Sequence, residues 1–155
     1  MANAMNGKLE RILLRVQKPA RYTGGEYNEV IKEKSEVDVR FAMCFPDTYE
    51  IGMSNLGLRI LYGVMNEAKG VWCERVFAPW GDMEAELRKA QIALYALESG
   101  DSLREFDFVG FSIGYEMAYT NVLNMLDLAE IPIHSADRGE GDPIIVAGGT
   151  CVYNG

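Results

Sequence analysis

The sequence is poor in the residues from which metal sites and disulfide frameworks are built. It has three cysteines, Cys44, Cys73 and Cys151, and a single histidine, His134. An odd number of widely spaced cysteines does not make a disulfide framework, and a self-contained zinc or iron–sulfur site needs three or four ligands. We therefore expect no metal site. Cys44 and Cys151, which lie in apolar stretches, are expected to be small core residues.

Long apolar runs and nucleotide-binding motifs are also missing. No stretch approaches the roughly 18 apolar residues that would span a bilayer, and no apolar segment near the N-terminus resembles a signal peptide. There is no Gly-x-Gly-x-x-Gly fingerprint, no Walker loop and no Ser-His-Asp set. These absences argue against dinucleotide-binding, nucleotide-hydrolysing and hydrolase functions. We expect a soluble cytoplasmic protein without a membrane partner.

Positive charge is scarce and uneven. The net charge is -8, yet the first 23 residues carry five basic side chains against one acidic one. An acidic body repels nucleic acid, so nucleic acid is not expected to bind there. The basic arm is either a solvated or internally paired face, or a contact for RNA or an acidic partner. Its basic residues are Lys8, Arg11, Arg15, Lys18 and Arg21.

Apolar residues recur with the period of a helix or of a strand along most of the chain. Side chains 37–45 alternate between apolar and other types, which is typical of a strand. Segment 82–99 repeats apolar residues at intervals of three and four, which favours a helix. The runs 106–113 and 143–149 are almost wholly apolar, as in strands covered on both faces. We expect helices over 7–17, 54–69, 82–99 and 120–128, and strands over 37–45, 71–78, 106–113 and 143–149.

The helix over 54–69 has an apolar stripe made of Leu56, Ile60, Val64 and Ala68. Strands that alternate with helices imply a parallel sheet with right-handed crossovers. The expected fold class is therefore α/β, a flavodoxin- or Rossmann-like three-layer α/β/α arrangement. The α/β domain would cover 37–155, preceded by a helix-and-loop arm over 1–36.

Ligands of such sheets bind beyond the carboxyl ends of the strands, where the strand order reverses. Three loops therefore matter most, those after the first, third and fourth strands. The candidate binding residues in these loops are Asp47, Tyr49, Gly52, Ser112, Gly148 and Gly149.

Each of these residues has a functional and a structural interpretation. Asp47 anchors a ligand or caps its own loop, and Tyr49 lines a cofactor or packs over the loop. Ser112 bonds a ligand or caps the backbone. Gly148–Gly149 lets backbone approach a nucleotide tail or forms a tight turn. Gly52 is expected to be needed for the backbone conformation of its loop, whether or not a ligand binds.

The same loops resemble those of cobalamin-binding domains, which carry Asp-x-His-x-x-Gly, Ser-x-Leu and Gly-Gly at these strand ends. Here the segments are DTYEIG over 47–52, SIG over 112–114 and the pair at 148–149. The resemblance implies that cobalamin contacts these positions. Tyr49 replaces the histidine, however, and a phenol with a pKa near 10 is a poor cobalt ligand at pH 7. Cobalamin would bind without a protein ligand beneath the cobalt, or the domain has kept the fold and lost the cofactor.

A wider resemblance covers most of the chain. KPARYTGGEYN, FPDTYEIGMSNLGLRILY and FDFVGFSIGYEMAYTNVLNMLDLAEIP resemble the N-terminal part of radical-SAM proteins with a B12-binding domain, often described as Fe-S oxidoreductases. In that family a barrel holds a [4Fe–4S] cluster through Cys-x-x-x-Cys-x-x-Cys and cleaves S-adenosylmethionine. The chain lacks this motif, so the resemblance places the cluster and S-adenosylmethionine in a domain beyond it.

The function that this resemblance implies is to position cobalamin or substrate next to its own radical-generating barrel. The alternative is a cofactor-free scaffold that docks the barrel or a macromolecular substrate such as RNA. The family pattern also continues with one more helix and strand. Without this last unit, the strand over 143–149 is expected to be an open edge at which two copies could pair.

Overall fold

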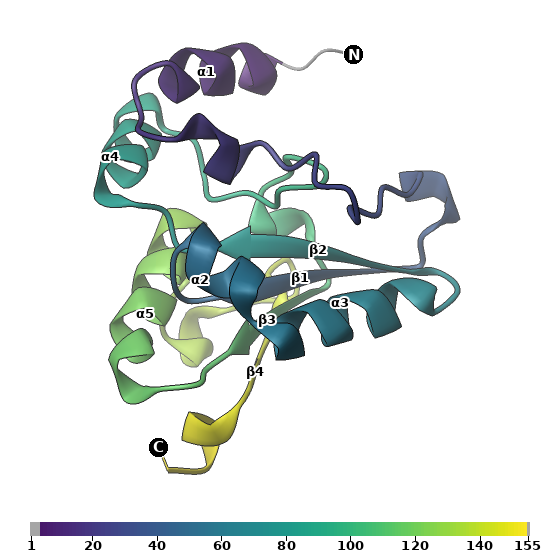
Figure 1. Cartoon of the computed structure of the whole chain (residues 1–155). Coiled ribbons are helices and arrows are strands. Elements are labelled where there is room, and N and C mark those ends of the chain that lie inside the picture. The colour runs from purple at the N-terminus through teal and green to yellow at the C-terminus, as the bar shows by residue number, and fades with distance from the viewer. Residues whose placement is uncertain (1–3, 155) are drawn as a thin grey trace.

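Four parallel strands form a single sheet in the computed structural model, which describes residues 4–154 (Figure 1). The strand order is β2-β1-β3-β4, so the direction of the strand order reverses between β1 and β3. This confirms the expected α/β class with a parallel, flavodoxin-like sheet. The strands are β1 (Val39–Phe45), β2 (Val71–Phe77), β3 (Phe108–Ser112) and β4 (Ile144–Gly148).

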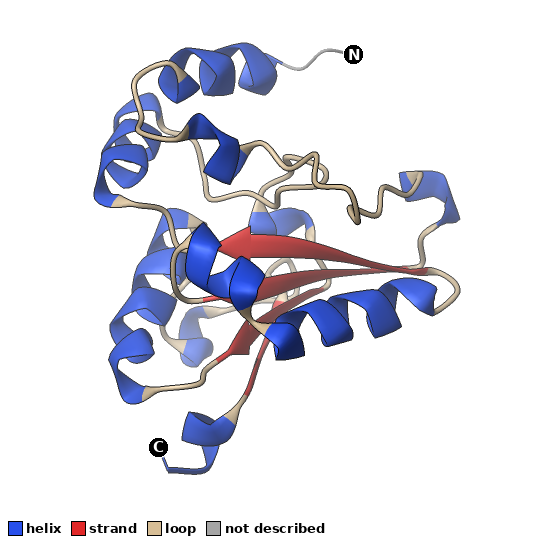
Figure 2. Cartoon of the chain, viewed as in Figure 1, coloured by secondary structure: helices blue, strands red, loops and turns tan. Residues whose placement is uncertain are grey.

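Helices lie on both sides of the strands (Figure 2). On one face, Leu58 and Tyr62 of α3 (Leu56–Glu67) pack against side chains of β1 and β2. On the other face, α4 (Gly81–Ala90) and α5 (Tyr119–Leu128) pack against alternate side chains of β1, β2 and β3. This is the expected three-layer arrangement. Cys44 and Cys151 are buried in the core under α4 and α5, as expected for small core residues.

The N-terminal segment packs onto the domain rather than extending from it. The first helix, α1 (Ala4–Leu13), is shifted from the expected range of 7–17 and lies beside α4 (Figure 1). Ile12 and Val16 are both buried, although the helix ends between them. Beyond α1, the backbone N–H of Gln17 donates to Asp82 on α4. The division at 36/37 stays a prediction.

The expected helix over 82–99 is wrong in its second half. The helix ends at Ala90, because Gln91 adopts the left-handed conformation with φ 52. Leu94 is buried but not helical: its backbone N–H donates to the carbonyl of Leu128. Residues 92–99 run beside β2, where the N–H of Leu97 donates to the carbonyl of Arg75. The apolar spacing correctly predicted that Met83, Leu87 and Leu94 are buried, but the helix that it predicted ends before Leu94.

The structure also corrects the expected apolar stripe. Asn55 caps α3, its Oδ1 accepting from the N–H of Leu58 at 2.9 Å. Leu56, Ile60 and Val64, however, are 67, 54 and 60% exposed. Leu56 and Ile60 line a groove together with Tyr27 and Asn28 of the N-terminal segment. The expected loop after the first strand contains the short helix α2 (Tyr49–Ser54).

The two edge strands differ in how their outer edges are covered. On β2, the side-chain amide of Asn66 bonds both the N–H and the carbonyl of Cys73, and Lys32 donates to the carbonyl of Val71. Within 4–154 nothing comparable covers β4, which was expected to be a buried strand and is largely exposed. β4 is the other edge strand of the described sheet, and pairing of two copies along it stays a prediction. No helix of the described residues is long and apolar enough to cross a membrane.

Candidate functional site

The loops after β1 and β3 meet at the point where the strand order reverses, and Asp47 joins them. Its Oδ2 accepts a hydrogen bond from the hydroxyl of Tyr115 at 2.5 Å, and its Oδ1 accepts from the N–H of Thr48 at 2.7 Å. The backbone carbonyl of Asp47 accepts from Ala78, just after β2. The bond to Asp47 raises the pKa of Tyr115. Asp47 therefore holds three chain segments at the carboxyl end of the sheet.

The first turn of α5 completes this edge. The side-chain amide of Asn121 donates to the carbonyl of Pro46 at 2.9 Å, and the hydroxyl of Tyr119 donates to the carbonyl of Cys151 at 2.9 Å. The helix start therefore bonds to the loop after β1 and to the loop after β4. We call this edge the rim. It comprises Pro46, Asp47, Ser112–Asn121 and Gly148–Tyr153.

Ser112 and Gly148 lie side by side in the rim, as register partners of β3 and β4. Among the described residues no side-chain hydrogen bond engages the hydroxyl of Ser112. A Cβ at Gly148 would have no heavy atom within 4 Å. Asp47, Ser112 and Gly148 thus lie at one edge of the sheet. Ser112 contributes a hydroxyl group to this edge, and Gly148 leaves open space beside it.

Gly149 and Gly52 have steric roles that do not require a ligand. Gly149 has φ +109, and a Cβ there would lie 2.2 Å from the carbonyl oxygen of Ile113. A Cβ at Gly52 would lie 2.2 Å from the ring of Phe77. Real Cβ atoms do not approach this closely, so any larger residue would shift the surrounding backbone or ring.

The side chain of Tyr49 does not point toward the rim between β1 and β3 but toward Glu26 and Phe77. Its hydroxyl donates to Oε1 of Glu26 at 2.6 Å, and its ring packs edge-to-face on Phe77 with centroids 5.5 Å apart. Burial and this hydrogen bond raise the pKa of Tyr49 to about 12. The phenol therefore keeps its proton at neutral pH and donates a hydrogen bond to the carboxylate of Glu26. It does not fit the role of a cobalt ligand.

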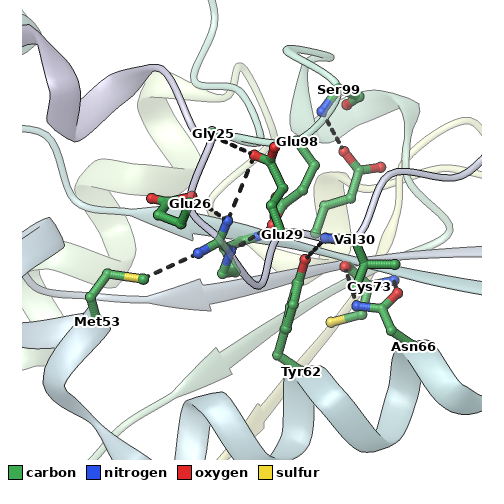
Figure 3. A network of polar contacts seen from close by, with 12 residues as sticks. Gly25, Glu26, Glu29, Val30, Met53, Tyr62, Asn66, Cys73, Glu98 and Ser99 are labelled. Atoms are coloured by element: carbon green, nitrogen blue, oxygen red, sulfur yellow. Dashed lines mark hydrogen bonds and ion pairs between the residues drawn. The ribbon is translucent and has the colours of Figure 1, made fainter.

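A buried cluster of charges, which the sequence interpretation missed, lies next to Tyr49. The guanidinium of Arg75 on β2 contacts Glu98 at 2.5 Å, Glu26 at 2.7 Å and Glu29 at 3.8 Å. Figure 3 shows these carboxylates converging on one point above the sheet. Burial raises the pKa of Glu98, whereas bonds from Tyr49 and Arg75 lower the pKa of Glu26 against the opposing effect of its burial.

This cluster joins the arm to the sheet. Glu26 and Glu29 belong to the N-terminal segment, Glu98 belongs to the strand-like segment after α4, and Arg75 lies between them. The adjacent Glu74 is fully buried and pairs with Arg40 at 2.5 Å. Two charged residues within the apolar segment VWCERVFA were the signal for this cluster, because charges inside a strand need buried partners.

The basic arm pairs partly with the domain itself. Arg15 contacts Glu86 at 3.2 Å, and Arg21 and Lys18 contact Glu50 at 2.7 and 3.6 Å. The hydrogen bond to Arg21 lowers the pKa of Glu50. These pairs favour the internally paired interpretation of the arm over a contact with RNA.

The described residues offer no site for an iron–sulfur cluster. No group of three or more His, Cys, Asp or Glu side chains within 4–154 is placed to hold a metal ion. Burial raises the pKa of the thiols of Cys44 and Cys73, which opposes the thiolate form that a cluster requires. The donor set of this domain therefore does not fit the cluster.

The chain was compared with protein families, with curated proteins and with solved structures. Residues 57–155, more than half of the chain, match the model of a family described as radical SAM proteins, N-terminal. No curated protein and no solved structure matches. The match begins within α3 and covers β2, β3 and β4 together with every rim residue beyond the loop after β1. The chain therefore belongs to the family of radical-SAM N-terminal domains.

Proposed function

We propose that this domain positions the catalytic barrel of a radical-SAM enzyme, and that the rim is the surface on which the barrel docks. The observation that carries the proposal is the concentration of exposed apolar and aromatic side chains at the rim and the adjoining turns of α5. Met117 is 81% exposed and Tyr153 is 91% exposed. The other exposed members are Tyr115, Tyr119, Leu123 and Val152.

Such a surface has the composition of a protein interface. Tyrosine and methionine are enriched at interface cores, and an exposed apolar group of this kind marks an interaction site. The rim is also held in shape before any partner arrives, because Tyr115, Tyr119 and Asn121 are hydrogen-bonded to neighbouring loops. Little conformational entropy would then be lost on docking.

Substitution of Met117 by glutamate tests this docking. We expect the variant to bind the separately expressed radical-SAM catalytic domain at least about tenfold more weakly, because a charge would be placed in the centre of the interface. Calorimetry provides the measurement. Leu14→Glu is the control, since Leu14 is equally exposed but lies in the N-terminal arm. Equal affinity of both variants and the wild type would argue against the rim as the docking surface.

Cobalamin at the rim is the second candidate, favoured by the unengaged hydroxyl of Ser112 and the open space at Gly148. When bound, cobalamin would supply an organocobalt centre to the radical enzyme. Within this chain, Asp47, Ser112 and Gly148 are the residues that would hold it, and Tyr49 would not ligate cobalt. The barrel and the cofactor would then share one surface.

A spectral titration separates the two candidates. If cobalamin binds, the visible spectrum of hydroxocobalamin shifts on addition of the chain. Gly148→Val removes the shift by filling the open space, and Tyr49→Phe leaves it unchanged. If the wild type produces no shift, the cobalamin candidate falls and docking of the barrel stands. A shift that Tyr49→Phe abolishes would contradict the assignment of Tyr49.

A further inference from the structure

The indole of Trp80 lies half-exposed where the chain leaves β2. The chain has two tryptophans, and they differ sharply. Trp72 is 2% exposed, and its Nε1 donates to the carbonyl of Val30 at 2.9 Å. Trp80 is 48% exposed, and no residue within 4–154 accepts a hydrogen bond from its Nε1. Trp80 therefore presents both a large apolar ring and an unused donor at the surface.

The local structure gives no reason for a tryptophan at this position. Trp80 is the N-cap residue of α4. N-caps are usually Ser, Thr, Asp or Asn, because a side-chain oxygen there accepts from a free N–H of the first helical turn. The indole has no acceptor, and the side chain of Trp80 makes no cap bond. A residue that departs from the local pattern without a gain in stability is expected at functional positions.

The N-terminal arm holds this indole in a fixed position. The guanidinium of Arg21 lies over the ring, with its central carbon 4.9 Å from the ring centroid, and its Nε donates to Oε1 of Glu50 at 2.8 Å. The backbone N–H of Trp80 donates to the hydroxyl of Tyr22 at 3.2 Å. Arg21 and Tyr22 are themselves buried. The exposed ring is thus supported from below by two ordered side chains.

The supported ring lies at the same end of the strands as the rim. The N–H of Ala78, between β2 and Trp80, donates to the carbonyl of Asp47 at 2.9 Å. Glu50, the partner of Arg21, belongs to α2, which directly follows the loop of Asp47. β2 and β4 are the opposite edges of the sheet. A helix and strand added beside β4 would therefore lie at the other edge from Trp80.

We propose that Trp80 is an anchor of the interface with the catalytic barrel, and that Arg21 is the residue that positions it. The proposal rests on the proposed docking of the barrel at the rim and extends that surface to the loop after β2. Tryptophan and arginine are enriched among residues that dominate binding energy, and a ring held in place beforehand loses little entropy on binding. Since Glu50 neutralises Arg21, the fitting partner surface is an apolar pocket with a hydrogen-bond acceptor for Nε1.

Fluorine NMR of the chain labelled with 5-fluorotryptophan tests this anchor directly. The labelled chain gives two resonances, and Trp80→Phe assigns them. On addition of the unlabelled, separately expressed catalytic domain, we expect the Trp80 resonance to move and to lose its shift between H2O and D2O. The resonance of the buried Trp72 should stay in place, which makes it an internal control.

Three variants separate the anchor from its support. Trp80→Ala is expected to weaken binding of the catalytic domain at least about tenfold, because the ring and its donor are both lost. Tyr27→Ala is the matched control, since Tyr27 is a fully exposed aromatic residue in the groove beside α3. Arg21→Lys keeps a charge near Glu50 but lacks the planar guanidinium. It should shift the Trp80 resonance of the free chain and weaken binding less than Trp80→Ala. Circular dichroism establishes that each variant is folded.

The outcomes distinguish this anchor from the docking of the rim. If Met117→Glu weakens binding while the Trp80 resonance stays in place and Trp80→Ala binds like the wild type, the anchor is wrong and the rim stands. If Trp80→Ala weakens binding and Met117→Glu does not, the anchor is supported and docking at the rim is contradicted. A catalytic domain that does not bind the chain overturns both. Equal losses for Trp80→Ala and Tyr27→Ala would also overturn the anchor.

Discussion

Replacing Arg75 with methionine is expected to destabilise the domain by about 3–5 kcal/mol, the usual effect of breaking a buried ion pair from one side. Arg75 is 5% exposed, and Glu98, its partner at 2.5 Å, has a fully buried side chain. Without the guanidinium, Glu98 would remain as an uncompensated buried carboxylate. Glu26 would lose its contact between the arm and β2 as well. Urea unfolding followed by circular dichroism measures the change.

A surface arginine provides the matched control. Arg88 also pairs with two carboxylates, Glu84 at 3.0 Å and Asp127 at 2.7 Å, but its side chain is 45% exposed. Because surface pairs contribute about 0–1 kcal/mol, Arg88→Met should change stability little. A second variant, Arg75→Met with Glu98→Leu, removes both buried charges and should be more stable than Arg75→Met alone. Equal losses for Arg75→Met and Arg88→Met would contradict the buried cluster.

Gly149→Ala is expected to destabilise the domain by about 2 kcal/mol or more, through left-handed strain and overpacking together. Gly149 has φ +109, where an alanine is strained, and its Cβ would lie 2.2 Å from the carbonyl oxygen of Ile113. That carbonyl belongs to the loop after β3, so the substitution would push two loops of the rim apart. Thermal and urea unfolding of the purified variant provide the measurement.

The neighbouring glycine offers a control one residue away. A Cβ at Gly148 would meet no atom within 4 Å. Gly148→Ala should therefore stay within about 0.5 kcal/mol of the wild type. If both alanine variants were equally stable, the close approach of the loops after β3 and β4 would be wrong.

The sheet and the position of the site could be predicted because they follow from local pattern. Alternation over 37–45 and the apolar runs over 106–113 and 143–149 predicted three of the four strands, and the carboxyl ends of parallel strands meet at one edge whatever the details of packing. Asp47, Ser112 and Gly148 do lie at that edge. The order of helices and strands along the chain was therefore enough to predict the fold class.

The contacts of individual residues depend on tertiary structure and could not be predicted. Leu94 belongs to a helical repeat by its spacing, yet it is not helical, and its backbone N–H donates to the carbonyl of Leu128 on α5. Tyr49 occupies the position of the histidine in the cobalamin-binding motif. Its hydroxyl, however, donates to Glu26, which lies 23 residues earlier in the chain. In both residues a partner distant in sequence decides the outcome.

We propose that the rim faces the catalytic barrel. Amide hydrogen exchange tests it most directly, by comparing this chain alone with the same chain bound to the radical-SAM catalytic domain. We expect slower exchange over residues 112–121 and 148–153 in the complex, with little change at the opposite ends of the strands. Protection confined to α3 and to the amino-terminal ends of the strands, with an unchanged rim, would contradict it.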